Sequence, residues 1–310
     1  MPTTVRNYIY YALRPLIPRF MQIKMRRILV HKQRILYANI WPINELANNS
    51  RNDWRGWPQG KKFALVLTHD VEKAAGQEKV KYLYQLEEDL GFRSSFNFVP
   101  LRYKVSSELR RILLEKGFEV GVHGLYHDGK LYKSYNEFKK RALLINHYLK
   151  DWKAVGFRSP AMHHNLEWIH ELNIEYDSST FDTDPFEPQS DGVTTIFPFL
   201  IQNKKSQNSY VELPYTLAQD STLFILMQEK TIDMWKRKLD WIAEHGGMAL
   251  LNTHPDYMNF SNSNLRLEEF PANLYAEFLE YVKTQYKDQY WHGLAKDVAR
   301  NYRKSQELQI

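Results

Sequence analysis

Cysteine is absent from the 310-residue chain, which excludes disulfide bonds and thiolate metal sites. Any metal ion must therefore be held by histidine and carboxylate side chains. Residues 1–44 also lack aspartate and glutamate, although they contain eight lysine and arginine residues. The rest of the chain has 34 basic and 36 acidic residues, so the net charge of +6 belongs to the N-terminal segment. Because the body of the protein has no basic stripe, we expect no nucleic-acid partner.

Long apolar runs are missing from the N-terminal segment as well. Pro15, Pro18 and several cations interrupt it, so no window reaches the roughly 18 apolar residues that a membrane span requires. The same interruptions leave no apolar core for a secretory signal, and we expect a cytoplasmic location. Residues 1–37 nevertheless mix cations with aromatic and aliphatic side chains. Two interpretations stay open: peripheral contact with an anionic membrane, or a helical extension packed on the rest of the protein.

Turn residues divide the chain into two regions. The stretch 48–60 is rich in Asn, Gly and Pro, so we expect a basic helical N-terminal extension over residues 1–60 and an α/β domain with C-terminal helices over residues 61–310. In the second region, strand-like and helix-like segments alternate, which is typical of βαβ units and a parallel sheet or barrel. The expected strands are 63–67, 94–99, 118–122, 154–157, 174–176, 210–213 and 248–252, and the expected helices are 78–90, 107–116, 136–149, 166–172 and 232–244.

Polar side chains follow three of these expected strands. Asp70 and Glu72 come after the first strand, His123 and His127 after the third, and His254 after the last. Each has a structural interpretation too, such as a hydrogen-bonded core histidine or a helix-capping carboxylate. However, the carboxyl ends of parallel strands meet at one edge, where barrels carry their chemistry. Imidazoles combined with a carboxylate suit a divalent ion such as zinc, so the sequence predicts a metal site at this edge.

The order and spacing of these motifs resemble the polysaccharide deacetylase family, also known as NodB-homology or carbohydrate esterase family 4 proteins. Thr68-His69-Asp70-Val71-Glu72 is similar to the family's first motif, the His123/His127 pair to its second, Arg158-Ser159-Pro160 to its third, Asp182-Thr183-Asp184-Pro185-Phe186 to its fourth and Leu251-Asn252-Thr253-His254 to its fifth. The resemblance covers roughly residues 61–260. It implies a distorted (β/α) barrel of about seven parallel strands, preceded here by the N-terminal helical extension.

The resemblance also implies an activity, namely metal-dependent hydrolysis that removes N-acetyl groups from a sugar or polysaccharide. Glu72, His123 and His127 would hold the divalent metal, expected to be zinc, which activates a water molecule. The family commonly has aspartate where this chain has Glu72, so the sequence leaves open whether Asp70 or Glu72 is the carboxylate ligand. The expected partner is an N-acetylated carbohydrate, in the assembly or modification of a surface polysaccharide.

The same resemblance implies roles for three further side chains. Asp70 would remove the proton from the attacking water, and His254 would protonate the departing amine. Arg158 would orient the base. Either Asp182 or Asp184 would hold His254 or Arg158, and the sequence does not choose between them.

Two other functions stay open at this point. One is hydrolysis of a non-sugar C–N bond on the same fold, and the other is a catalytically inactive carbohydrate-binding or assembly protein. A second pair of histidines, His163 and His164, follows the third motif. We expect this pair to lie on the loop surface, with metal ligation as its alternative.

Overall fold

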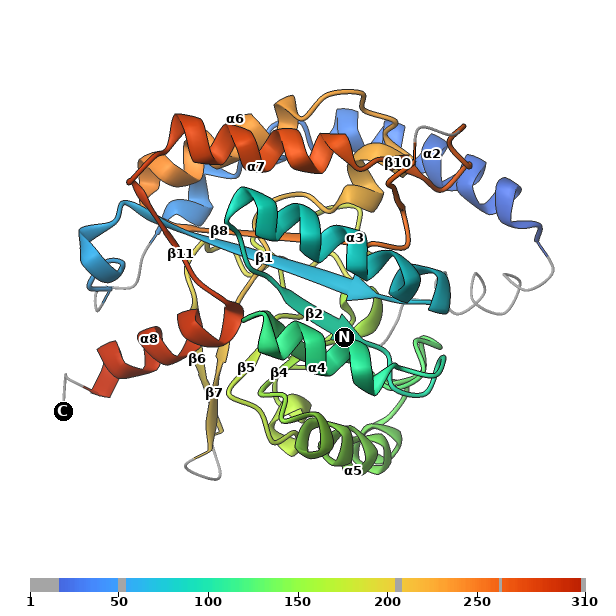
Figure 1. The fold of residues 1–310 in the computed structure, drawn as a ribbon, viewed down its shortest axis with the longest axis vertical. Helices are drawn as coiled ribbons and strands as arrows, with labels where there is room; N and C mark the ends of the chain where they lie inside the picture. Colours follow the sequence, from blue (N-terminus) through green and yellow to red (C-terminus); the bar gives the residue numbers. More distant parts are fainter. Residues whose placement is uncertain (1–16, 50–53, 204–207, 262–263, 308–310) are drawn as a thin grey trace.

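A curved nine-stranded sheet forms the centre of the structure (Figure 1). The structure is a computed structural model, and it describes residues 17–49, 54–203, 208–261 and 264–307. Its strands are β1 (Phe63–Val71), β2 (Ser95–Phe98), β3 (Glu119–His123), β4 (Gly156–Arg158), β5 (Tyr176–Asp177), β6 (Phe199–Gln202), β7 (Ser209–Glu212), β8 (Met248–Thr253) and β11 (Tyr290–His292). Their order is β11-β1-β2-β3-β4-β5-β7-β6, and β8 also pairs with β1. Only the β6–β7 pairing among these described strands is antiparallel. A separate two-stranded sheet pairs β9 (Met258–Asn259) with β10 (Phe270–Pro271).

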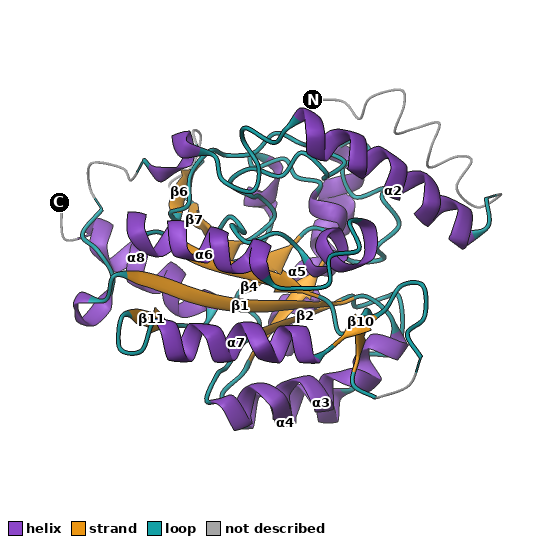
Figure 2. Ribbon diagram, turned by 90° about the horizontal axis from the view of Figure 1, so that it is seen from above, coloured by secondary structure: helices purple, strands orange, loops and turns teal. Residues whose placement is uncertain are grey.

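Helices surround the curved sheet (Figures 1 and 2). They are α2 (Arg19–Leu36), α3 (Ala74–Leu90), α4 (Ser107–Glu115), α5 (Tyr135–Trp152), α6 (Asp233–His245), α7 (Asn273–Gln285) and α8 (Ala295–Glu307). Short 3-10 helices are η2 (Glu45–Asn48), η3 (Pro58–Gly60), η4 (Pro160–Met162) and η5 (Trp168–Glu171), and a π-helix, η6, spans Ser221–Leu226. No helix in the described ranges has the length and apolar character needed to cross a bilayer.

Alternation along β1 decides which side chains enter the barrel. Leu65 and Leu67 pack in the large apolar cluster shared with the helices, whereas Ala64 and Val66 belong to a second cluster on the opposite face of the strand. Because successive side chains of a strand point to opposite faces, the same alternation carries Asp70 to the inner face. The strand thus ends by presenting a carboxylate inside the barrel.

The sheet comes close to closing on itself. An isolated parallel bridge joins Leu217, after β7, to Leu251 in β8. Seven parallel strands, β8-β1-β2-β3-β4-β5-β7, therefore follow one another around the barrel. This arrangement confirms the predicted distorted (β/α) barrel.

The expected elements differ from the structure in several places. β1 continues beyond residue 67 to Val71, so the first motif lies largely within the strand. The expected helix 166–172 is wrong, since only the 3-10 turn η5 forms there. Just 17 residues separate β4 from β5, and η4 already occupies the start of this connection. Strands β6, β9, β10 and β11 lie outside the segments that the sequence analysis identified as strands.

The N-terminal extension packs on the barrel through α2. Ile23 and Val30 of this helix are buried, and α2 contacts η6. Helix α2 therefore packs on the barrel, whereas residues 1–16 lie outside the described residues, and peripheral membrane contact of residues 1–37 stays a prediction. The division at residue 60 stays a prediction, and the Trp54 ring stacks on Tyr302 of α8 across it.

Candidate active site

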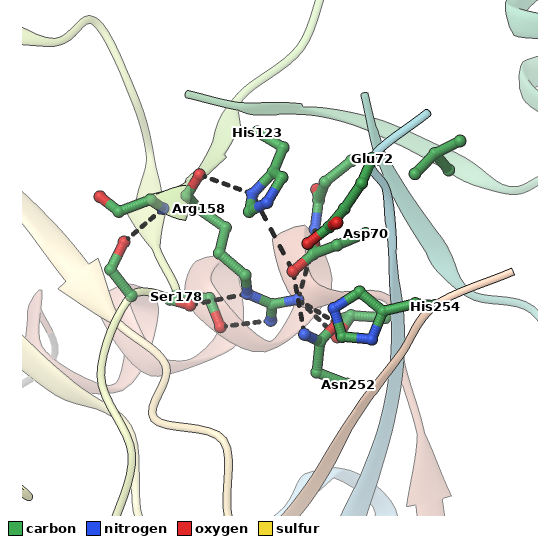
Figure 3. A network of polar contacts seen from close by, with 12 residues as sticks. Asp70, Glu72, His123, Arg158, Ser178, Asn252 and His254 are labelled. Atoms are coloured by element: carbon green, nitrogen blue, oxygen red, sulfur yellow. Dashed lines mark hydrogen bonds and ion pairs between the residues drawn. The ribbon is translucent and has the colours of Figure 1, made fainter. Parts of the chain in front are cut away.

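Strand register brings the predicted site residues together at one end of the barrel (Figure 3). Asp70 on β1 lies opposite Asn97 on β2, and His123 on β3 lies opposite Arg158 on β4. On the other side of β1, register places β8 so that its last residues lead into His254. Residues on or just after five parallel strands therefore meet where those strands end, as expected for a barrel.

Asp70 is buried and is held by three donors. Its Oδ1 accepts hydrogen bonds from Asn97 Nδ2 at 3.0 Å and from Arg158 Nη1 at 3.2 Å, and its Oδ2 accepts one from Asn252 Nδ2 at 2.9 Å. Burial alone would raise the pKa of Asp70, but the charges of Arg158, His123 and His254 hold that pKa well below its usual range. The carboxylate is therefore ionised at neutral pH.

Arg158 is fully enclosed and joins Asp70 to the barrel wall. Its Nη1 also donates to Asn252 Oδ1 at 2.6 Å and to Thr68 Oγ1 at 2.9 Å. On the opposite edge of the guanidinium, Nε donates to the carbonyl of Ser178 and Nη2 to its hydroxyl, both at 2.8 Å. A planar guanidinium bonded on both edges cannot rotate freely, so it fixes the orientation of Asp70.

Glu72, His123 and His127 form a group that could hold a metal ion. One ligand atom from each lies within 4.8 Å of the others, and this is the sole such group of three or more acidic or histidine side chains in the described residues. The carboxylate in the group is Glu72, not Asp70. Its Oε1 lies 3.0 Å from Nε2 of His127.

The ring nitrogens of the two histidines are arranged as metal ligands require. Nδ1 of His123 donates to the carbonyl oxygen of Arg158 at 3.1 Å, which leaves the lone pair on Nε2. Nε2 of His127 is buried and, within the described part of the chain, has no hydrogen-bond partner of suitable geometry. A buried nitrogen that lies beside a carboxylate without forming a hydrogen bond is costly unless a ligand binds it, so the donor set fits a divalent metal such as zinc.

Burial and charge also set the protonation of this group. Burial lowers the pKa of His123 to about 4, so its imidazole is neutral at pH 7. Burial would raise the pKa of Glu72, but the adjacent His127 holds that pKa well below its usual range. A neutral imidazole and an ionised carboxylate are the forms that bind metal.

A loop, and not a helical turn, brings His127 beside His123. His123 is the last residue of β3, whereas His127 has left-handed backbone with φ of 55°. Gly124 also has positive φ, at 61°, and a β-carbon there would lie 2.4 Å from Cγ of Pro160. The position of His127 beside His123 therefore depends on glycine at position 124 and on its tight contact with Pro160 of the third motif.

His254 is paired with Asp220, a residue that the motif comparison did not identify. Nδ1 of His254 lies 2.7 Å from Asp220 Oδ1, and the backbone N–H of His254 donates to Oδ2 at 2.7 Å. Although burial lowers the pKa of His254, the charge and hydrogen bond of Asp220 raise it to about 10. The imidazole is therefore protonated at neutral pH, with its charge stabilised by a buried carboxylate.

The expected role of the fourth motif is wrong. Asp182 forms a buried ion pair with Lys238 at 2.5 Å, and Asp184 accepts a hydrogen bond from Tyr215 at 2.8 Å. Neither contacts His254 or Arg158. Asp220, and not Asp182 or Asp184, is the carboxylate that holds His254. The one feature of the sequence that could have identified Asp220 is that it is the sole acidic residue between positions 213 and 228.

The remaining histidines near the motifs have structural partners. His69 points away from the barrel interior. On the outer side of the strand, its Nδ1 lies 2.7 Å from Thr253 Oγ1 and its Nε2 lies 2.8 Å from Glu87 Oε1. His164 bonds through Nδ1 to the carbonyl of Met162. His163 and His164 are partly buried in their loop and do not belong to the metal group described above.

Comparison with known proteins addresses the fold. No protein-family model matches the sequence, and no curated protein sequence matches it. Solved structures do resemble it. A provisionally assigned polysaccharide deacetylase from Mycobacterium smegmatis has a TM-score of 0.64 at 19% identity, covering 81% of this chain and 93% of that chain.

Two further structures agree to the same extent. Puue allantoinase has a TM-score of 0.63 at 16% identity, with coverage of 83% of this chain and 94% of that chain. A second provisionally assigned polysaccharide deacetylase, from Pseudomonas aeruginosa PAO1, has a TM-score of 0.63 at 17% identity, with coverage of 84% and 96%. At these identities the likeness concerns the fold. The chain therefore has the fold of the NodB/carbohydrate esterase family 4 polysaccharide deacetylases, as its motifs predict.

Proposed function

We propose that the protein is a metal-dependent hydrolase that removes an N-acetyl group from a sugar or polysaccharide. The observation that carries this proposal is the group Glu72, His123 and His127 beside the buried Asp70 and the charged His254. The fold and the five motifs support the choice of an N-acetylated carbohydrate as substrate.

The metal, which we propose to be zinc, would be held by Glu72, His123 and His127. When bound, it would supply a Lewis acid that lowers the pKa of water and stabilises negative charge on the substrate oxygen. The hydrogen bond from His123 to the Arg158 carbonyl keeps this imidazole in the required tautomer.

Asp70 is the proposed general base. It removes a proton from water as the water oxygen forms a bond to the carbonyl carbon of the acetyl group. Arg158 and Asn252 hold the carboxylate in place through hydrogen bonds to both of its oxygens. Because the base is already oriented, no free energy is lost in orienting it during the reaction.

His254 is the proposed general acid. Asp220 occupies Nδ1, which leaves the Nε2 proton for transfer to the departing nitrogen as the C–N bond breaks. The products are acetate and a free amine. Since Asp220 stabilises the imidazolium, His254 stays charged until the leaving group requires its proton.

A second candidate is hydrolysis of a C–N bond outside sugars. The observation that favours it is the likeness to an allantoinase, whose TM-score is similar to those of the two deacetylases. Allantoin therefore belongs beside N-acetylated sugars in the substrate panel. An inactive carbohydrate-binding protein remains the third interpretation and predicts no turnover with either.

Metal content and acetate release from the same samples test the proposal. We expect near-stoichiometric zinc, measured by mass spectrometry, in the wild type and its loss in a His123→Ala/His127→Ala double variant. Acetate release from N-acetylglucosamine oligomers should fall with the metal. A His163→Ala/His164→Ala double variant is the matched control and should keep both.

The outcomes separate the candidates. Metal without acetate release, but with allantoin turnover, would favour the second candidate. No metal after reconstitution would rule out the proposed mechanism. The cytoplasmic location also stays a prediction, and cell fractionation with an antibody to the protein tests it.

A further inference from the structure

Helix α2 exposes most of its apolar side chains. Seven of them are exposed, with exposed fractions from 45% for Met21 to 73% for Leu36. The seven are Phe20, Met21, Met25, Ile28, Leu29, Ile35 and Leu36. At 100° per residue they fall on one side of the helix, which we call the outer face of α2.

The opposite side of α2 buries Ile23 and Val30 and otherwise contacts the barrel through polar groups. Arg27 Nε donates to the carbonyl of Ile225 at 2.9 Å, and Gln33 Nε2 donates to that of Pro185 at 3.0 Å. Arg34 forms an ion pair with Glu229. An ordinary surface helix buries most of its apolar side chains, whereas α2 buries two and exposes seven.

Two lysines, Lys24 and Lys32, lie on the outer face among the apolar side chains. No carboxylate of the described residues forms an ion pair with either lysine, and α2 itself contains no acidic residue. Two copies of this face in a symmetric dimer would place lysines against lysines without a compensating acid. Apolar side chains flanked by unpaired cations instead complement a bilayer surface with anionic headgroups.

We propose that the outer face of α2 docks on a membrane that contains anionic lipids, with the helix lying in the plane of the interface. Both overall views place α2 at the end of the molecule toward which β1 points (Figures 1 and 2). The helix packs on η6, which directly follows Asp220, the partner of His254. Docking would thus hold the strand-end site close to the membrane surface. Vesicle binding does not require turnover, so this inference is independent of the proposed function.

Vesicle flotation of the full chain tests the proposal. We expect binding to vesicles of phosphatidylcholine with phosphatidylserine and much weaker binding to phosphatidylcholine alone. Ile28→Glu should weaken binding at least about tenfold, because it places a charge where an apolar side chain would be buried. Lys24→Gln and Lys32→Gln should each weaken it roughly fivefold, with the effect decreasing in high salt.

Leu143→Glu is the matched control, because Leu143 on α5 is 72% exposed and Ile28 is 62% exposed. This variant should bind like the wild type, and circular dichroism should show all variants folded. Absence of wild-type binding would overturn the proposal. Binding that the α2 substitutions leave unchanged would also overturn it and assign the contact to residues 1–16. A dimer in solution that Ile28→Glu dissociates, without vesicle binding, would identify a second copy as the occupant instead.

Discussion

His69 and Asp70 are neighbours in β1 but belong to two different polar networks. On the outer face of the strand, His69 uses both ring nitrogens, on Thr253 and on Glu87. Tyr275 also donates to Glu87 at 2.5 Å. All members of this outer network are buried, and the imidazole has no free position.

The inner network consists of Asp70, Glu72, His123, His127, Arg158 and His254. It is also largely buried, with Glu72 and His127 partly exposed, but it ends in groups that are open to a ligand. His127 leaves Nε2 without a hydrogen-bond partner among the described residues, and the imidazole ring of His254 is bonded to Asp220 through Nδ1. Burial and charge are therefore poor guides to function in this barrel. The informative property is whether each ring nitrogen is already satisfied by the protein, because a closed network stabilises the fold and an open one can perform chemistry.

Asp70→Asn should have the largest effect and tests the inner network. The amide has nearly the shape of the carboxylate but cannot accept a proton, so kcat/KM should fall by about 10³. Metal content should stay unchanged, because Asp70 is outside the metal group. Acetate release per bound metal ion measures this. Retained activity would show that another group is the base.

Glu87→Gln tests the outer network. It removes a buried carboxylate that is hydrogen-bonded to His69, Ser94 and Tyr275, so the free energy of unfolding should fall by about 2 kcal/mol. Activity per folded molecule should match that of the wild type. Urea unfolding and acetate release on the same preparation check the two halves of this prediction. A variant with normal stability but lowered activity would break the distinction between the networks.

Asp220→Asn should change the pH dependence of the reaction. With Asp220 present the pKa of His254 is raised to about 10, so activity should persist to about that pH and then decline as the imidazolium loses its proton. Without the carboxylate the pKa should fall, moving the alkaline limb toward neutral pH and lowering kcat at pH 9 by about 10². The stability from this pair should be complete below pH 6.5 and be lost as pH rises through 10. Rate profiles from pH 6 to 11 test the shift, and Asp191→Asn, at an exposed aspartate, is the control.

Glu72→Asp should have the smallest of these effects. The change keeps the charge but withdraws the carboxylate by one methylene, so zinc affinity should fall about tenfold, with the metal still bound at saturation. Competition with a chelator measures the affinity. An unchanged affinity would mean that Glu72 does not bind the metal.

The sequence predicted the residues of the inner network better than it predicted the residues and loops that hold them in place. Strand alternation and motif order were sufficient to gather Asp70, His123 and Arg158 at one edge, because register in a parallel barrel leaves few alternatives. Asp220 was not predictable in this way. It lies in a segment between β7 and η6 that has no strand pattern, and its partner is 34 residues away.

The conformation of the loop that carries His127 could not be predicted from the sequence pattern either. Its conformation depends on positive φ at Gly124 and His127 and on contact with Pro160, a residue of another motif. Spacing alone is compatible with either a helix or a loop. Likewise, the orientation of α2 depends on the carbonyl groups of Ile225 and Pro185, which accept hydrogen bonds from Arg27 and Gln33 and are remote from the helix in sequence.

The pairing of β8 with β1 has a consequence for the newly made chain. Thr68 lies opposite Asn252, 184 residues later, and the proposed base and acid each lie two positions further along the chain. A chain still being synthesised has the base and both metal-binding histidines long before it has β8. Contacts of such long sequence separation form slowly. The last strand to join the barrel therefore completes the site, so a truncated product that ends before residue 248 would lack the acid while still exposing an unpaired edge of β1.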